Sequence, residues 1–94
     1  MNQNYYVYIL TNRINTVLYI GITACLRKRL YIHKRRLVKG FTSRYHVWKL
    51  VYVETYSNVN EAIVREKQLK NWHKEWKVNL IREKNPHFEE ILLK

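Results

Sequence analysis

The sequence contains very little of the residues that mark several classes of protein. Its 94 residues include one cysteine, one proline and two glycines. A single cysteine excludes an internal disulfide framework, no Cys/His spacing resembles a zinc site, and so little glycine and proline excludes a low-complexity chain. No stretch is long and apolar enough to span a bilayer, and polar residues rather than a secretory signal follow Met1. We therefore expect a folded protein of the cytoplasm that has no membrane partner.

Acidic residues are also scarce. Seven Asp and Glu face 18 Lys and Arg, which gives a formal net charge of +11. Because the excess gathers in residues 27–44 and 65–77, we expect a nucleic acid as partner, ahead of an anionic membrane surface or of a charge that serves only solubility. The side chains expected to bind nucleic acid are Arg27, Lys28, Lys34, Arg35, Arg36, Lys39, Arg44 and Lys70.

The length and the hydrophobic content of 47% predict one domain with its own core, residues 1–94, in which residues 4–84 form the core and 85–94 a tail. Residues 5–10 and 16–22 carry β-branched and aromatic side chains on both faces, which predicts two strands. The asparagine-rich residues 12–15 form the predicted hairpin loop. In that register Tyr8 pairs with Tyr19 on one face of the sheet.

After Gly21 the period of the apolar residues changes from that of a strand to that of a helix. Thr23 is the predicted N-cap. Arg29 precedes His33 by one helical turn, so both side chains point from the border of the apolar stripe toward the sheet. The stripe consists of Leu26, Leu30, His33 and Leu37.

A looser stretch at residues 39–45 leads into a third predicted strand at 48–56. The following helix begins at Asn58, which forms a capping box with Glu61, although Ser57 is an alternative cap. Its predicted inward stripe is Ala62, Glu66, Leu69, His73 and Trp76.

The predicted stripe of this helix contains the carboxylate of Glu66, and a buried carboxylate needs a partner. We expect a break near Trp72, a last helix that ends before Asn85, and a tail that docks through Phe88 and Leu92 or frays. The predicted fold is α+β: a small three-stranded antiparallel sheet with helices packed on it, in the order β-β-α-β-α-α.

Several spaced elements together resemble the GIY-YIG nuclease family, and most closely its small stand-alone bacterial members. "YVY" at residues 6–8 is followed by "YIG" at 19–21, then by Arg29 and His33, and later by "REKQLK" from Arg65. The resemblance covers nearly the whole chain and is specific as a set. One departure is that Tyr6 stands where the family's first half-motif has glycine.

The resemblance implies roles for individual residues. It assigns catalysis to Tyr8, Tyr19, Arg29 and His33, a divalent metal ion to Glu66, and a structural role to Gly21. The expected ion is Mg²⁺, with Mn²⁺ as the alternative. The family's asparagine near the C-terminal end matches either Asn79 or Asn85.

These residue types suit phosphodiester hydrolysis. Arg29 offers a cationic fork for a phosphate. Tyr8 is the candidate for activating the attacking water, and since its ordinary pKa is about 10, Arg29, nearby lysines or the metal would have to favour the phenolate. Each residue also has a structural interpretation: the tyrosines as packing, His33 as a core histidine, and Glu66 as an ion pair with Arg44.

The tryptophans Trp48, Trp72 and Trp76 are predicted to pack in the core and between helices, and His46 is given no role. The expected function is a metal-dependent endonuclease that hydrolyses DNA, with preference for branched or distorted structures, in repair or recombination. The alternative is a nucleic-acid-binding protein, for DNA or RNA, that keeps the fold without catalysis. A monomer and a weak homodimer are both compatible with the sequence.

Overall fold

A three-stranded antiparallel sheet forms the middle layer of the protein. The computed structural model describes residues 3–37 and 39–93. Strands β1 (Tyr5–Thr11), β2 (Leu18–Thr23) and β3 (Lys49–Tyr56) lie in the order β2-β1-β3. The central strand β1 is also the most deeply buried, because its neighbours protect both edges and helices cover both faces, and residues 7–11 are all buried.

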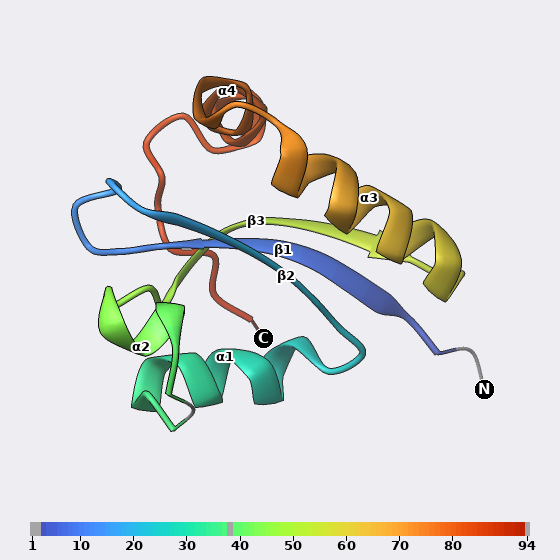
Figure 1. The fold of residues 1–94 in the computed structure, drawn as a ribbon, viewed down its shortest axis with the longest axis horizontal. Coiled ribbons are helices and arrows are strands. Elements are labelled where there is room, and N and C mark those ends of the chain that lie inside the picture. The colour runs from blue at the N-terminus through green and yellow to red at the C-terminus, as the bar shows by residue number, and fades with distance from the viewer. Residues whose placement is uncertain (1–2, 38, 94) are drawn as a thin grey trace.

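Helices cover both faces of this sheet, as Figure 1 shows. Helices α1 (Leu26–Arg35) and α2 (Phe41–Arg44) lie on one face, and α3 (Val59–Asn71) and α4 (Lys74–Lys84) lie on the other. The predicted α+β fold and its element order are confirmed. Among the described residues, no helix is both long and apolar enough to cross a membrane.

Helix α2 was not predicted, because it lies in the stretch expected to be irregular. It is a single turn that follows Gly40, whose φ of 146° is open only to glycine at low cost. The backbone N–H of Arg44 donates to the carbonyl oxygen of Gly40 at 3.0 Å. So short a turn has no room for the apolar periodicity that identifies a helix in a sequence.

Alternate residues of β1 point into two separate cores. Val7 and Ile9 pack beneath α3 and α4, whereas Tyr8 and Leu10 pack against α1 and the start of β3. All four side chains are at most 1% exposed. The two-residue period of the strand therefore places Tyr8, but not its neighbours, in the layer that holds α1.

The hairpin loop between β1 and β2 is longer than predicted, and the predicted register is wrong by two residues. Tyr8 pairs with Gly21 instead of Tyr19. The side-chain oxygen of Asn12 accepts a hydrogen bond from the backbone N–H of Thr16 at 2.8 Å, which holds Thr16 in the loop. Because the shift is even, Tyr8 and Tyr19 remain on one face of the sheet.

Both predicted ends of α1 need correction. Cys25 is the N-cap, and Thr23 is the last residue of β2, where its hydroxyl accepts a hydrogen bond from the Cys25 N–H at 3.1 Å. Arg36 adopts the left-handed conformation, with φ of 53°, and ends the helix. Leu37 therefore leaves the apolar stripe and is 62% exposed.

Helix α3 begins and ends where the sequence predicts. The side chain of Asn58, rather than the neighbouring serine, accepts a hydrogen bond from the Glu61 N–H at 3.2 Å. The chain breaks at Trp72, which is extended with φ of −71° and ψ of 149°. His73 and Trp76 consequently fall outside the stripe of α3, and Trp76 is 53% exposed.

The tail after α4 passes round the β3 edge of the sheet toward the α1 layer (Figure 1). Helix α4 ends before Asn85, as predicted, and Phe88 is 7% exposed. The Ile91 N–H then donates to the carbonyl oxygen of Leu50 on β3 at 2.8 Å. Docking through Phe88 is confirmed, but Leu92 is 76% exposed, because it is Ile91 that turns inward.

Candidate active site

A contact between Tyr8 and His33 lies between the sheet and α1. Tyr8 is 1% exposed and His33 is 8% exposed. The Tyr8 hydroxyl oxygen lies 3.2 Å from Nε2 of His33. Leu26 and Leu30 fix α1 against the sheet through the same apolar stripe, so His33 is delivered to Tyr8 by the helical period.

Tyr19 completes a group of three rings. Its ring centroid lies 6.3 Å from that of Tyr8 and 5.5 Å from that of His33. Phe41 of α2 stacks on Tyr19, with the ring centroids 6.2 Å apart and 27° between the ring planes. Tyr19, on the outer strand β2, thus contacts both the buried pair and the exposed Phe41.

Gly21 makes room for the Tyr8 ring. A Cβ atom at Gly21 would lie 2.4 Å from both Cζ and the hydroxyl oxygen of Tyr8, closer than real Cβ atoms come to a heavy atom. Because Gly21 has no side chain, the Tyr8 ring can lie directly over β2 at the edge of the sheet. We expected Gly21 to ease the passage from strand to helix, whereas the close approach is to a side chain of the neighbouring strand.

Burial raises the pKa of the Tyr8 phenol well above its ordinary value, and the Tyr19 phenol adds to this rise. Arg29 lowers the pKa, in the direction expected from the sequence, but does not outweigh burial. The carboxylate of Glu66 raises it further, which places Glu66 within electrostatic reach of Tyr8. In the resting site Tyr8 is therefore a neutral phenol at neutral pH.

The imidazole of His33 is neutral in the resting site as well. Burial lowers the pKa of His33, and the positive charge of Arg29 lowers it further. In the tautomer that carries its hydrogen on Nδ1, Nε2 is an acceptor and the Tyr8 hydroxyl donates to it; in the other tautomer Nε2 donates to the Tyr8 oxygen. The pair is a phenol that has a base already hydrogen-bonded to it.

Arg29 lies one turn before His33 on α1, and its side chain is exposed. Its charge lowers the pKa of both Tyr8 and His33, so the guanidinium is within electrostatic reach of the pair. The eight side chains predicted to bind nucleic acid are exposed too. Seven of them lie on α1, on α2 or between these helices, on the same side of the sheet as Tyr8.

Glu66 approaches the site from α3, and 14% of its side chain is exposed. It forms an ion pair with Lys70, one turn further along the helix, at 2.8 Å. The partner that we considered from the sequence was Arg44, but the Arg44 guanidinium lies over the Tyr45 ring at 5.7 Å. The carboxylate is thus within electrostatic reach of Tyr8 and has Lys70 as its cationic partner.

The residues around Glu66 fit a metal ion that takes one carboxylate from the protein and its other ligands from water and substrate. Across residues 3–37 and 39–93, no three His, Cys, Asp or Glu side chains gather to hold a metal ion. Mg²⁺ is commonly held by one or two carboxylates, with water and substrate phosphate in the remaining positions. Glu66 beside a basic surface fits that mode, and a metal held by protein ligands alone does not fit.

The two asparagines considered from the sequence lie elsewhere. The side-chain nitrogen of Asn85 donates to the carbonyl oxygens of Val51 and Glu89 at 3.0 and 2.9 Å, so Asn85 fastens the tail to β3. Asn79 is exposed on α4, on the other face of the sheet from Tyr8.

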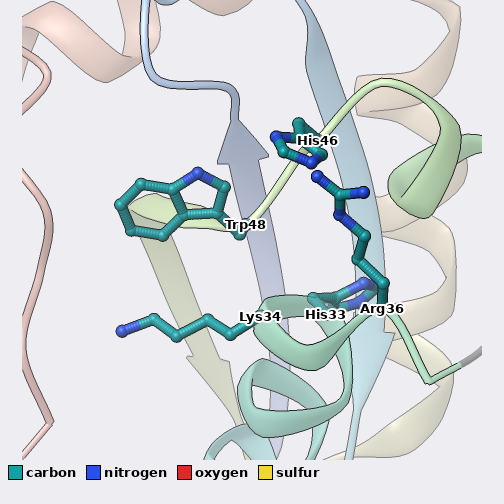
Figure 2. Close-up of a pocket in the computed structure, with 5 residues that line it drawn as sticks. All are labelled: His33, Lys34, Arg36, His46 and Trp48. Atoms are coloured by element: carbon teal, nitrogen blue, oxygen red, sulfur yellow. The ribbon is translucent and has the colours of Figure 1, made fainter.

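Three aromatic neighbours of the site were not identified from the sequence. Phe41 stacks on Tyr19, while His46 and Trp48 share the lining of a pocket with His33 (Figure 2). Trp48 was expected in the core but is only half-buried, and Trp72, which packs on the α3 side, does behave as expected. The one local signal was the density of aromatic and basic residues at 41–48.

Comparison with known proteins agrees with this arrangement. A family model described as the GIY-YIG catalytic domain matches residues 4–79. The solution NMR structure of the UPF0213 protein BH0048 from Bacillus halodurans superposes with a TM-score of 0.59 at 26% identity, over 92% of this chain and 90% of that one. No curated protein is similar enough to count as a relative.

The matched residues include both strands of the hairpin, α1 with Arg29 and His33, and α3 with Glu66. The match thus spans each element that supplies the site, and the structural neighbour is likewise a small protein matched over nearly its whole length. The chain belongs to the GIY-YIG family, a family of nucleases.

Proposed function

We propose that this protein is an endonuclease that hydrolyses phosphodiester bonds of DNA with the help of a divalent metal ion, Mg²⁺ first. The observation that carries the proposal is the contact of 3.2 Å between the Tyr8 hydroxyl oxygen and Nε2 of His33, beside the charges of Arg29 and Glu66. A protein that only binds nucleic acid does not need a buried phenol in contact with an imidazole beside its basic surface.

The pair supplies a path for the proton of the attacking water. Tyr8 must lose its phenolic proton before its oxygen can accept one from water, and its raised pKa keeps it a neutral phenol in the resting site. When Nε2 of His33 accepts the phenolic proton, the Tyr8 oxygen accepts a proton from water, and the hydroxide attacks phosphorus. The bond to the leaving oxygen breaks, this oxygen takes a proton from solvent, and His33 returns its proton to solvent.

Arg29 provides the charge that this reaction needs at the phosphate. Its guanidinium can bind two non-bridging oxygens at once and stabilise the charge that develops on them. A divalent ion held by Glu66 would supply further Lewis-acid stabilisation of the phosphate. Tyr19, held between His33 and Phe41, orients the Tyr8 ring.

The substrate we propose is branched or distorted DNA, because so small a surface offers little for reading a sequence. We place the protein in the cytoplasm, since its one cysteine, Cys25, is free and suits a reducing compartment. The processes that use branched DNA, repair and recombination, are the proposed role.

The experiment is cleavage of labelled single-stranded, duplex, flap and four-way-junction DNA with Mg²⁺, with Mn²⁺ or with chelator. Arg29→Ala and Glu66→Ala accompany the wild type, and Arg82→Ala on α4 is the control for lost positive charge. We expect metal-dependent cleavage that both site variants lose and the control keeps.

A second candidate is a binding protein without catalysis. It is favoured by the ion pair between Lys70 and Glu66, which occupies the carboxylate that a metal would need. Salt-sensitive binding by all the proteins, with no cleavage of any substrate in any metal, would establish this alternative.

A further inference from the structure

A pocket of about 330 Å³ opens beside the candidate active site, between the C-terminal end of α1 and the segment that follows α2 (Figure 2). This size is at the lower end of pockets that hold small ligands, which run from roughly 300 to 1,000 Å³. Its lining residues are His33, Lys34, Arg36, His46 and Trp48, none of which carries a carboxylate.

One wall of the pocket carries positive charge. The backbone of Arg36 is fixed in the left-handed turn that ends α1, where its N–H donates to the carbonyl oxygen of His33 at 3.2 Å. Its guanidinium points toward the ring of His46 (Figure 2). Two nitrogen-bearing side chains therefore converge at the mouth of the pocket, a geometry that suits a phosphate.

The opposite wall is the indole ring of Trp48 (Figure 2). Its backbone N–H donates to the carbonyl oxygen of Thr11 at 3.2 Å, which ties the residue to the end of β1. The ammonium of Lys34 lies 5.5 Å from the ring centroid and also pairs with Glu90 at 2.7 Å. The charge of Glu90 is thereby paired beside the pocket, and the indole of Trp48 offers an aromatic surface to its interior.

We propose that this pocket holds the nucleotide next to the bond that is cut, with its phosphate between Arg36 and His46 and its base against Trp48. The ligand is a nucleoside monophosphate unit. Because His33 contacts Tyr8 and also lines the pocket, the two phosphate positions are neighbours along one strand. The inference rests on the proposed function and adds a second position at which the protein binds the DNA strand.

The first test is a titration of the full-length ¹⁵N-labelled protein with thymidine 5′-monophosphate in chelator, followed by NMR. Inorganic phosphate and thymidine are titrated separately, and Trp48→Phe identifies the Trp48 indole resonance. We expect saturable shifts of Trp48 and Arg36 with the nucleotide, and of Arg36 alone with phosphate. An unmoved Trp48 resonance, or shifts by thymidine as large as those by the nucleotide, would overturn the proposal.

Two matched variants separate this pocket from general electrostatic attraction. Arg36→Gln should weaken nucleotide binding about tenfold, whereas Arg82→Gln, which loses the same charge from an exposed side chain of α4 on the other face of the sheet, should change it less than about twofold. Equal losses in both variants would contradict the pocket. Heteronuclear spectra of each variant establish that it is folded.

The two proposals fail in different ways. Nucleotide binding in chelator does not depend on cleavage, so a protein that binds the nucleotide at Trp48 but cuts no DNA would contradict the proposed function and support the pocket. A protein that cuts DNA, with Arg36→Gln no different from Arg82→Gln in nucleotide binding, would do the reverse.

Discussion

At the scale of single residues, the missing side chain of Gly21 decides where the Tyr8 hydroxyl lies. A larger residue on β2 would meet the ring at 2.4 Å and push it away from the edge of the sheet. The hydrogen bond to His33 depends on that position, since α1 approaches from the same face. The missing Cβ atom of Gly21 thus allows the contact between Tyr8 and His33 that we propose to be catalytic.

Gly21→Ala should lower the free energy of unfolding by about 2 kcal/mol, because the Tyr8 ring must move out of a packed position. In a Tyr8→Ala background the same change should cost less than about 1 kcal/mol, since the clashing ring is gone. Urea denaturation of the four proteins in this cycle measures both values. An equal cost in the two backgrounds would show that Gly21 is needed for another reason.

His33 should titrate below its ordinary pKa of about 6.5, because burial and Arg29 both disfavour the imidazolium. Arg29→Gln removes one of these two causes, so the pKa of His33 should rise in that variant. The His33 ring resonances followed by NMR from pH 4 to pH 8 report both values. If Arg29→Gln leaves the pKa of His33 unchanged, the charge of Arg29 does not act on His33.

The sequence predicts the members of the Tyr8–His33 contact better than its geometry. Spacing alone indicates Tyr8, Tyr19 and His33, since strand and helix periods determine which side chains share a face. The hydrogen bond itself depends on a register that the sequence alone did not predict correctly. The stacking of Phe41 depends on α2, which has no periodic signal.

At the scale of elements, a network around Glu54 joins β3 to α3. Nε and Nη2 of Arg65 donate to the two carboxylate oxygens of Glu54, each at 2.9 Å. The hydroxyls of Tyr52 and Tyr56 donate to the same carboxylate. The guanidinium of Arg65 also lies over the ring of Trp72 at 5.2 Å. The network thus fixes α3, and with it Glu66, relative to the sheet.

The Glu54 network should make stability depend on pH. Burial by itself would raise the pKa of Glu54, but the hydrogen bonds from Arg65 and the two tyrosines outweigh it, so the pKa is lowered. The stabilisation is therefore present above the unfolded-state pKa of about 4.3 and is lost as pH falls through the lower folded-state value.

Glu54→Gln should cost about 2 kcal/mol at pH 7, because it leaves the charge of Arg65 without its partner. The difference from wild type should shrink as pH falls below about 4. Urea denaturation between pH 7 and pH 3 measures it, with Glu83→Gln, exposed on α4, as control. A difference that stays constant with pH would show that the carboxylate charge is not involved.

Elements with long periodic or apolar patterns could be predicted, and their short connections could not. The strands, α1, α3 and α4 follow from period and composition, and the cap at Asn58 follows from its local chemistry. The hairpin register depends on Asn12. Its side-chain oxygen accepts the hydrogen bond from the Thr16 N–H, which longer strands would have formed between their backbones. The end of α1 depended on the left-handed backbone of Arg36.

At the scale of the whole molecule, the charge of +11 is unevenly placed. Most of the side chains predicted to bind nucleic acid lie on the α1 and α2 side of the sheet, where Tyr8 and His33 also lie. Helix α4 lies on the opposite face. The arrangement directs a polyanion to the face that carries the site.

Binding of a labelled DNA duplex should therefore respond differently to charge removal on the two faces. Lys28→Gln on α1 should reduce the slope of log affinity against log salt by about 0.9, the value for one lost phosphate contact. Arg82→Gln on α4 should leave the slope nearly unchanged. Fluorescence anisotropy at several salt concentrations measures both slopes, and equal slopes in the two variants would show that binding has no preferred face.

The most direct test of the Tyr8–His33 pair as the reaction centre is single-turnover cleavage by Tyr8→Phe, on the DNA that the wild type cuts fastest. The substitution keeps the ring over Gly21 and removes only the hydroxyl that lies 3.2 Å from Nε2 of His33. We predict a rate at least about 100-fold below wild type with DNA affinity unchanged. Cleavage at the wild-type rate would contradict a catalytic role for this hydroxyl.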